Sequence, residues 1–216
     1  MTVVARMAAV ERVMRLSCVI AVVVIEDRAH AAPLARALCA GGVRAIEVTL
    51  RTPAALDSIR AIADEVPDAV VGAGTLLTPG DFAQALKAGA TFGVSPGATR
   101  FLLDAADDIE LPFLPGAATA SEAMRNLERG YRFQKFFPAS AAGGPALLKS
   151  LAGPLPQIGF CPTGGITSAT AREWLALPNV LCVGGSWLTP KDALAAGDWA
   201  KLEALAREAC ALGTRP

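Results

Sequence analysis

A single lysine, Lys135, lies inside an aromatic run near the middle of the chain, in the segment RFQKFFPA. Burial among phenylalanines removes the water that stabilises an ammonium group, and this favours the uncharged amine. An uncharged amine can attack a ketone and form an imine. Because a protonated imine draws electrons from a neighbouring carbon–carbon bond, this lysine is a candidate nucleophile for making or breaking such a bond.

Two further charged residues, Glu47 and Arg51, occur in the segment RAIEVTLR. Alternate residues of a strand share one face, so these two would point to the same side, as would Phe133, Lys135 and Phe137 in their own strand. A carboxylate can carry the protons that imine chemistry moves, and a planar guanidinium fits a substrate carboxylate. The alternative is a buried ion-pair network that only fills a core, and the spacing leaves both interpretations open.

Two glycine pairs lie where predicted strands end, in the segments CPTGGITSAT and VGGSW. In barrel proteins the loops after the seventh and eighth strands commonly hold phosphate. The backbone N–H groups of Gly164, Gly165 and Gly185, together with the Ser186 hydroxyl, are suitable donors. Paired glycines also permit tight turns without any ligand. The P-loop pattern GxxxxGKS or GxxxxGKT is absent, which argues against a nucleoside triphosphate.

Short β-branched runs alternate along the chain with alanine- and leucine-rich stretches, which is typical of successive βα units around a parallel sheet. Eight such units predict an α/β fold, a lean (β/α)8 TIM barrel, whose second and sixth strands face each other and whose catalytic residues lie at the C-terminal ends of the strands. The alternative is an open doubly wound sheet, which usually has a glycine-rich turn after its first strand, whereas here EDRAHAAP follows. The expected strands are Cys18–Ile25, Arg44–Leu50, Ala69–Leu76, Thr91–Pro96, Pro112–Ala117, Arg132–Pro138, Ile158–Thr163 and Val180–Gly185.

The chain has no linker, low-complexity tract or break in composition, so residues 1–216 are expected to form one domain. Residues 1–17 would provide an extra helix, from Val3 to Leu16, that caps the N-terminal end of a barrel formed by residues 18–212. Helix boundaries are expected at Thr52-Pro53, Thr78-Pro79, Thr119 with Glu122, and Gly41-Gly42.

Composition limits the partners of the chain. Twenty basic and twenty acidic residues give no net charge to attract nucleic acid or an anionic membrane. The single histidine, His30, excludes a histidine-rich metal site, and five cysteines without metal-ligand spacing indicate reduced thiols. Two of them, Cys161 and Cys182, lie on neighbouring expected strands and could approach each other. The apolar run CVIAVVVI is shorter than the ~20 residues that span a bilayer. We therefore expect a cytoplasmic protein that acts on a small molecule.

Seven segments occur in a specific order along the chain: GGVRAIEVTLRTP, VGAGTLLTP, VSPGAT, PFLPGAATASE, FQKFFPA, FCPTGGI and CVGGSWL. Together they resemble the family of 2-keto-3-deoxy-6-phosphogluconate (KDPG) and 4-hydroxy-2-oxoglutarate (KHG) aldolases, from about Cys18 to Cys210. The resemblance implies a homotrimeric class I aldolase of the Entner–Doudoroff pathway, a lyase that cleaves the phosphorylated sugar acid into pyruvate and glyceraldehyde 3-phosphate. It also implies that no metal or other cofactor is needed, and that KHG is a second substrate.

The same resemblance implies roles for individual residues, with Lys135 as the Schiff-base lysine and Glu47 as the general acid and base. The chain departs from the family pattern in its first strand, where Ala21 replaces a frequent proline and Val24 lies near the place of a phosphate-binding arginine. Phosphate binding is therefore expected to depend on backbone amides and a hydroxyl. The implied substrate-binding residues are Arg51, Thr75, Pro96, Phe137 and Thr163, and the implied phosphate-binding residues are Gly164, Gly165 and Ser186.

Two other functions fit the same residues. A phosphate-binding barrel isomerase or epimerase would use acid and base groups without a covalent intermediate. A phosphosugar-binding barrel without activity would use Lys135 only as a counter-ion. A covalent adduct on Lys135 would distinguish an aldolase from both.

Overall fold

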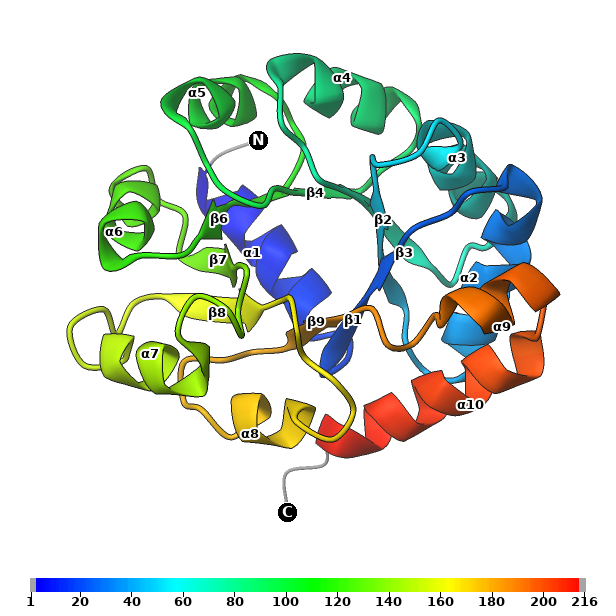
Figure 1. Ribbon diagram of the computed structural model, residues 1–216. Coiled ribbons are helices and arrows are strands. Elements are labelled where there is room, and N and C mark those ends of the chain that lie inside the picture. The colour runs from blue at the N-terminus through cyan, green and yellow to red at the C-terminus, as the bar shows by residue number, and fades with distance from the viewer. Residues whose placement is uncertain (1–2, 214–216) are drawn as a thin grey trace.

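The computed structural model describes residues 3–213, which form parallel strands surrounded by helices (Figure 1). The strands are β1 (Val19–Val23), β2 (Ala45–Thr49), β3 (Val70–Gly74), β4 (Phe92–Val94), β5 (Phe113–Leu114), β6 (Gly116–Ala117), β7 (Phe133–Phe136), β8 (Gly159–Pro162) and β9 (Val183–Gly185). The helices are α1 (Val3–Met14), α2 (Ala31–Ala40), α3 (Ala55–Glu65), α4 (Pro79–Lys87), α5 (Arg100–Asp108), α6 (Ala120–Glu128), α7 (Gly144–Leu151), α8 (Ala171–Leu175), α9 (Lys191–Ala196) and α10 (Trp199–Cys210), with the 3-10 turns η1 (Arg28–His30) and η2 (Ala211–Gly213).

The strands form a curled parallel sheet in two hydrogen-bonded parts, with the orders β5-β4-β3-β2-β1-β9 and β6-β7-β8. Apart from β9 beside β1, neighbouring strands follow one another in sequence, without the reversal of order that a doubly wound sheet has. Isolated parallel bridges, Phe160 to Val180 and Thr163 to Gly184, join β8 to the segment that contains β9. The sequence alternative of an open doubly wound sheet is therefore wrong.

Each of the eight expected strand segments contains a strand, but the fifth, Pro112–Ala117, contains two. Pro115 separates β5 from β6, since proline has no N–H to donate to a neighbouring strand. Its carbonyl still accepts a hydrogen bond from the Lys135 backbone N–H at 2.9 Å. The chain therefore leaves β4 at Pro115 and joins β7, which contains the lysine.

The strands are buried on both faces because helices cover the outer face of the sheet and the sheet curls around its inner face (Figure 1). All five residues of β1 and all five of β2 are buried, which explains their nearly continuous apolar sequences. Within β2 the polar exceptions are Glu47 and Thr49. The Thr49 hydroxyl is satisfied by the Val23 carbonyl at 3.1 Å, whereas Glu47 points to the site described below.

Helix boundaries follow the expected cap residues with one exception. Capping boxes are present at Thr78 with Asp81 and at Thr119 with Glu122, and α2 ends immediately before Gly41. Hydrogen bonds from the backbone N–H groups of Ala118 and Thr119 lower the pKa of Glu122. The expected start at Thr52-Pro53 is wrong, because α3 begins at Ala55 and the Thr52 hydroxyl instead donates to the Ile25 carbonyl at 2.5 Å.

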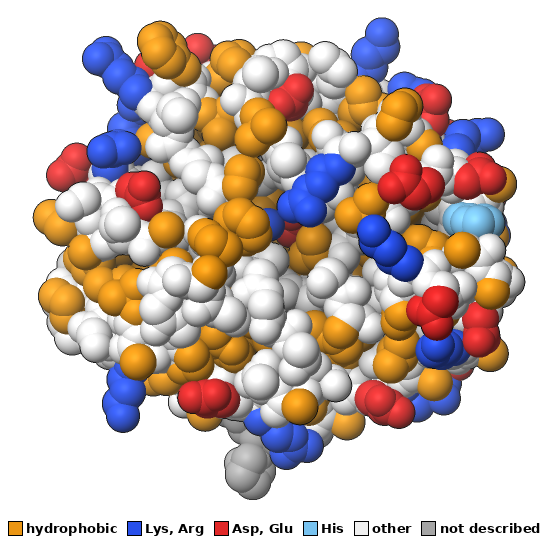
Figure 2. All heavy atoms as spheres, viewed as in Figure 1, with side chains coloured by type: hydrophobic (Ala, Val, Ile, Leu, Met, Phe, Trp, Pro, Cys, Tyr) orange, Lys and Arg blue, Asp and Glu red, His pale blue; other side chains and the backbone are white. Residues whose placement is uncertain are grey.

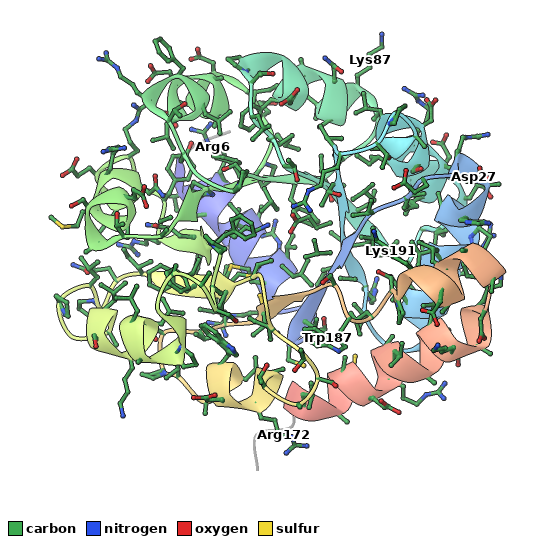
Figure 3. All side chains as sticks on the ribbon, in the orientation of Figure 1. Arg6, Asp27, Lys87, Arg172, Trp187 and Lys191 are labelled. Atoms are coloured by element: carbon green, nitrogen blue, oxygen red, sulfur yellow. The ribbon has the colours of Figure 1, made fainter. Side chains whose placement is uncertain are left out.

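Helix α1 lies at the N-terminal end of the strands and contacts β5 and β7. Buried Arg6 donates to the carbonyls of Ala106 at 2.7 Å and Asp107 at 2.8 Å, at the end of α5 (Figure 3). The Asp107 carboxylate also accepts hydrogen bonds from Arg129 and from the Tyr131 hydroxyl. This network fixes α1 at the end opposite to the expected catalytic residues. Among the described helices, none is long and apolar enough to cross a membrane.

Candidate active site

The centre of the site is a direct contact between Lys135 on β7 and Glu47 on β2. The lysine Nζ donates to Glu47 Oε1 at 3.0 Å. Glu47 is only 3% exposed and Lys135 4% exposed. The two strands belong to different hydrogen-bonded parts of the sheet, so the side chains meet across its interior. Alternation along the strands predicts this meeting, and the structure confirms it.

Apolar groups surround the amine. The Phe137 ring centroid lies 5.4 Å from Lys135 Nζ, and the lysine itself is buried. Separated charges are costly in such surroundings, while a hydrogen-bonded amine and carboxyl group can exchange a proton over a short distance. The arrangement therefore places a primary amine and a carboxyl group within proton-transfer distance of each other.

Gly74 on β3 gives the Glu47 carboxylate its space. A Cβ atom built on Gly74 would lie 2.2 Å from Glu47 Oε1 and 2.6 Å from its Cγ. Only a residue without a side chain can pass the carboxylate this closely. Sequence reasoning assigned no role to Gly74, although a glycine inside a strand signals a close approach of this kind.

Arg51 lies at the end of β2 and is exposed, so it does not join Glu47 and Lys135 in one buried ion-pair network. Its Nε donates to the Thr75 hydroxyl at 3.2 Å. Thr75 has a φ of 62°, a left-handed conformation that is unusual for a residue other than glycine. The bond uses the inner nitrogen of the guanidinium, so both terminal nitrogens stay in position to bind a carboxylate.

Pro96 connects to the lysine through Gly116. A Cβ atom on Gly116 would lie 2.3 Å from the Pro96 carbonyl group, and Gly116 pairs with Lys135 between β6 and β7. The Gly116 N–H also donates to the buried Ser95 hydroxyl at 3.3 Å. Gly116 is a second residue that sequence reasoning missed, and it places the half-buried Pro96 beside the strand that holds the amine.

The two glycine-rich turns lie side by side at the ends of β8 and β9. A Cβ atom on Gly184 would lie 2.1 Å from the Thr163 hydroxyl oxygen, and the two residues form a parallel bridge. Gly164 and Gly165 have φ values of 103° and 77°, and a Cβ on Gly164 would lie 3.3 Å from the Phe137 ring. These turns therefore lie next to the wall of the amine site.

Gly185 and Ser186 complete this group of turns. The Trp187 ring packs on Gly185, where a Cβ atom would lie 2.4 Å from it, and Ser186 is exposed. Two consecutive residues with positive φ, as at Gly164 and Gly165, can turn successive N–H groups toward an anion. We call Gly164, Gly165, Gly185 and Ser186 the glycine cradle.

Two features lie outside the site. Cys161 and Cys182 approach each other, as expected, and both are free thiols. The hydrogen bond that the Cys182 thiol makes to Cys161, together with its full burial, raises the pKa of Cys182, so it stays protonated and unreactive. A cavity of about 910 Å³ lies near the N-terminal ends of the strands, with Met14, Cys18 and Arg172 in its lining. That lining lacks the pair of Lys135 and Glu47.

Comparison with known proteins agrees with this geometry. Residues 10–205 match the family described as KDPG and KHG aldolase. The chain is 53% identical over 199 residues to the KHG/KDPG aldolase of Escherichia coli (strain K12), covering 92% of this chain and 93% of that protein. Together with the motifs above, this match indicates an aldehyde-lyase.

Solved structures give the same result. The KDPG aldolase of Legionella pneumophila, with pyruvate captured as a covalent carbinolamine intermediate, superposes with a TM-score of 0.91 at 48% identity and covers 93% of this chain and 97% of its own. The KDPG aldolase of Zymomonas mobilis with 3-phosphoglycerate has a TM-score of 0.91 at 49% identity and covers 95% and 97%. The chain therefore belongs to the KDPG and KHG aldolase family.

Proposed function

We propose that the protein cleaves KDPG into pyruvate and glyceraldehyde 3-phosphate through a Schiff base on Lys135. The observation that carries this proposal is the buried 3.0 Å contact between Lys135 Nζ and Glu47 Oε1. An isomerase or epimerase needs acid and base groups but no buried primary amine. A lysine that served only as a counter-ion would not need a place inside the sheet.

Imine formation uses the two residues as one unit. The Lys135 ammonium passes a proton to Glu47, and the neutral amine attacks C2 of the keto acid. Glu47 protonates the former ketone oxygen and takes a proton from the new C–N group, which gives a carbinolamine. Loss of water, with a proton again supplied by Glu47, leaves a protonated imine and the Glu47 carboxylate. The captured carbinolamine of the Legionella pneumophila enzyme is consistent with this order of steps.

Bond cleavage uses the imine as the electron acceptor. The Glu47 carboxylate takes the C4 hydroxyl proton, directly or through one water, as the C3–C4 bond breaks and its electrons form the enamine. Glyceraldehyde 3-phosphate leaves. Glu47 then returns the proton to C3, and water hydrolyses the imine to pyruvate and the Lys135 ammonium, so the cycle is balanced.

The remaining site residues position the substrate. Arg51, fixed to the Thr75 hydroxyl at 3.2 Å, binds the keto-acid carboxylate and so orients the ketone toward the amine. We assign Pro96 and Phe137 to the apolar walls of the site, and Thr163, whose hydroxyl lies against Gly184, to the substrate hydroxyls.

We assign the phosphate to the glycine cradle, residues Gly164, Gly165, Gly185 and Ser186. The support is the pair of consecutive positive φ values and the adjacency of the two turns. The Zymomonas mobilis enzyme was solved with 3-phosphoglycerate, a phosphorylated three-carbon acid. We propose KHG as a second substrate, since the Escherichia coli relative is named for both compounds.

We further propose that the two parts of the sheet close into a single (β/α)8 barrel, and that the whole chain is one domain. Support comes from the bridges between β8 and the β9 segment, and from the short step across Pro115 between β5 and β6. The five free thiols fit a cytoplasmic location.

A homotrimer is our proposal for the assembly. Large apolar side chains remain exposed on the single chain, including Val4 at 79% and Phe101 at 77%. Exposed apolar groups of this size often mark contact surfaces between subunits. Light scattering coupled to size-exclusion chromatography would give three times the 22.2 kDa chain mass if the proposal is correct.

The function is tested by measuring pyruvate release from KDPG and from KHG with a coupled lactate dehydrogenase assay. We expect steady cleavage of KDPG and measurable cleavage of KHG. The control is the Lys135→Met variant, which removes the amine and keeps a side chain of similar length. Equal activity of the variant and the unaltered protein would contradict the proposal.

A further inference from the structure

We propose that Lys191 is a specificity-determining residue that provides a cationic partner for the substrate phosphate. This proposal rests on the proposed function, because it adds one contact to the same site. The glycine cradle contains only amides and a hydroxyl, whereas a phosphate monoester carries about −1.5 to −2 charges at pH 7. Such groups commonly gain a charge-assisted contact from lysine or arginine.

The chain after the cradle folds back before it reaches Lys191. The Thr189 N–H donates to the Ser186 carbonyl at 3.3 Å. A turn of this kind brings its first and last Cα atoms to within about 7 Å. Pro190 follows with φ −54° and ψ 136°, and Lys191 is the first residue of α9. The backbone of Lys191 therefore lies two residues from a turn that begins in the cradle itself.

The side chain of Lys191 points inward on the face that holds the site. Figure 3 shows it extending from the start of α9 toward the middle of this face, whereas Lys87 points outward from the edge of the molecule. In the same orientation, Figure 2 shows basic side chains around a hollow at the middle of the face, with basic and acidic groups recessed inside it. A lysine in this position faces the entrance that a phosphorylated substrate would use.

The ammonium of Lys191 is available to a phosphate, while the other cations near the site have a partner or another assigned ligand. Lys135 contacts Glu47 at 3.0 Å, and Arg51, whose Nε donates to Thr75 at 3.2 Å, is assigned to the keto-acid carboxylate. On the neighbouring helix, Lys201 pairs with Asp192 at 3.3 Å. Lys191 forms no ion pair with any residue between positions 3 and 213. A bound phosphate would provide the missing counter-charge.

This contact would discriminate between substrates by their phosphate. The phosphate lies far along the substrate from the C3–C4 bond, so a contact there changes binding and leaves the chemical step unchanged. Replacement of Lys191 should therefore change KM for KDPG. It should not change KM for 2-keto-3-deoxygluconate, the matching compound without phosphate.

The test compares Lys191→Met, Lys191→Arg and the control Lys87→Met on both substrates. For Lys191→Met we expect KM for KDPG to rise about 5-fold, the size of a solvent-exposed ion pair, with kcat unchanged. Values for 2-keto-3-deoxygluconate should match those of the unaltered protein, and Lys191→Arg should restore most of the affinity for KDPG. Added salt should reduce the difference between Lys191→Met and the unaltered protein. Lys87→Met should change nothing.

Equal changes on both substrates, or no change on either, would overturn the role of Lys191. Reductive trapping of pyruvate on Lys135 in each variant separates this result from failure of the proposed function. If pyruvate is trapped on Lys135 but the Lys191 variants show no effect that is selective for the phosphorylated substrate, only the Lys191 proposal is refuted. If the unaltered protein neither traps pyruvate nor cleaves either substrate, both proposals are wrong.

Discussion

Gly74 and Glu47 approach so closely that a Cβ atom at position 74 would lie 2.2 Å from Glu47 Oε1. The proposed acid and base group is therefore held in place by the backbone of the neighbouring strand as well as by its hydrogen bond to Lys135. Gly74 has no side chain that could take part in the reaction, but it contributes to catalysis by positioning the Glu47 carboxylate.

Replacement of Gly74 tests that link. In Gly74→Ala the carboxylate must move away from the amine, and displacements of about 1 Å can cost on the order of 100-fold in rate. We expect kcat for KDPG cleavage to fall about 10- to 100-fold while the circular dichroism spectrum is retained. The matched control is Gly153→Ala, because a Cβ at Gly153 meets nothing within 4 Å. Activity of Gly74→Ala equal to that of Gly153→Ala would show that the close approach has no functional role.

Glu47→Gln preserves the shape of the side chain and removes its ability to carry a proton. We expect exchange of the pyruvate methyl protons to slow by about 100-fold or more, because general acid–base groups contribute about 100- to 10,000-fold. Imine formation should be partly retained, since Lys135 is still present. Proton NMR of pyruvate in D2O measures the exchange, and an unchanged rate would contradict the assigned role.

Arg51→Lys keeps the positive charge and removes the planar fork. Since Arg51 is held by the Thr75 hydroxyl, loss of this geometry should weaken binding of the keto-acid carboxylate and raise KM for KDPG about 10-fold. The control is Arg60→Lys, an exposed residue paired with Asp57 on α3. Initial-rate kinetics would contradict the assignment if both variants gave the same KM.

Tyr131 belongs to the hydrogen-bond network around Asp107 at the N-terminal end of the strands. We expect this tyrosine to make the protein less stable at alkaline pH. Burial, and then the hydrogen bond to Asp107, raise the pKa of Tyr131 well above its ordinary value of 10.0. A raised pKa stabilises the fold below the unfolded-state value, and this contribution is lost as the pH rises toward the folded-state value. Between pH 9 and 11.5, the free energy of unfolding should therefore fall more for the unaltered protein than for Tyr131→Phe. Urea titrations across this pH range give the free energy of unfolding of both proteins. The prediction is contradicted if this free energy falls equally with pH in the two proteins.

Much of the fold could be predicted from the sequence because strands buried on both faces leave nearly continuous apolar runs, as β1 and β2 do. The break at Pro115 was not predicted, since its neighbours Phe113, Leu114 and Ala117 fit one strand equally well. The start of α3 was misplaced because Thr52 bonds to a distant carbonyl, that of Ile25, instead of capping the helix.

Part of the candidate site was predictable, because side chains alternate along a strand. This alternation predicts that Glu47 and Lys135 both point to the inner face of the sheet. The glycines of β3 and β6 could signal a close approach, but the groups that Gly74 and Gly116 approach were not predictable, because the register between strands decides which backbone passes which side chain. The Arg51 to Thr75 bond depends on the left-handed conformation of Thr75, which a threonine does not normally adopt.

The Schiff-base mechanism is tested most directly by reductive trapping of pyruvate on the protein with borohydride, followed by mass spectrometry of the tryptic peptides. We expect a reduced pyruvate adduct on Lys135, which blocks tryptic cleavage after that residue and joins Phe133–Lys135 to Phe136–Lys149 in one heavier peptide. The Lys135→Met variant should give no adduct. A protein that keeps its fold and cleaves KDPG while its two peptides stay separate and unmodified would contradict the Schiff-base mechanism.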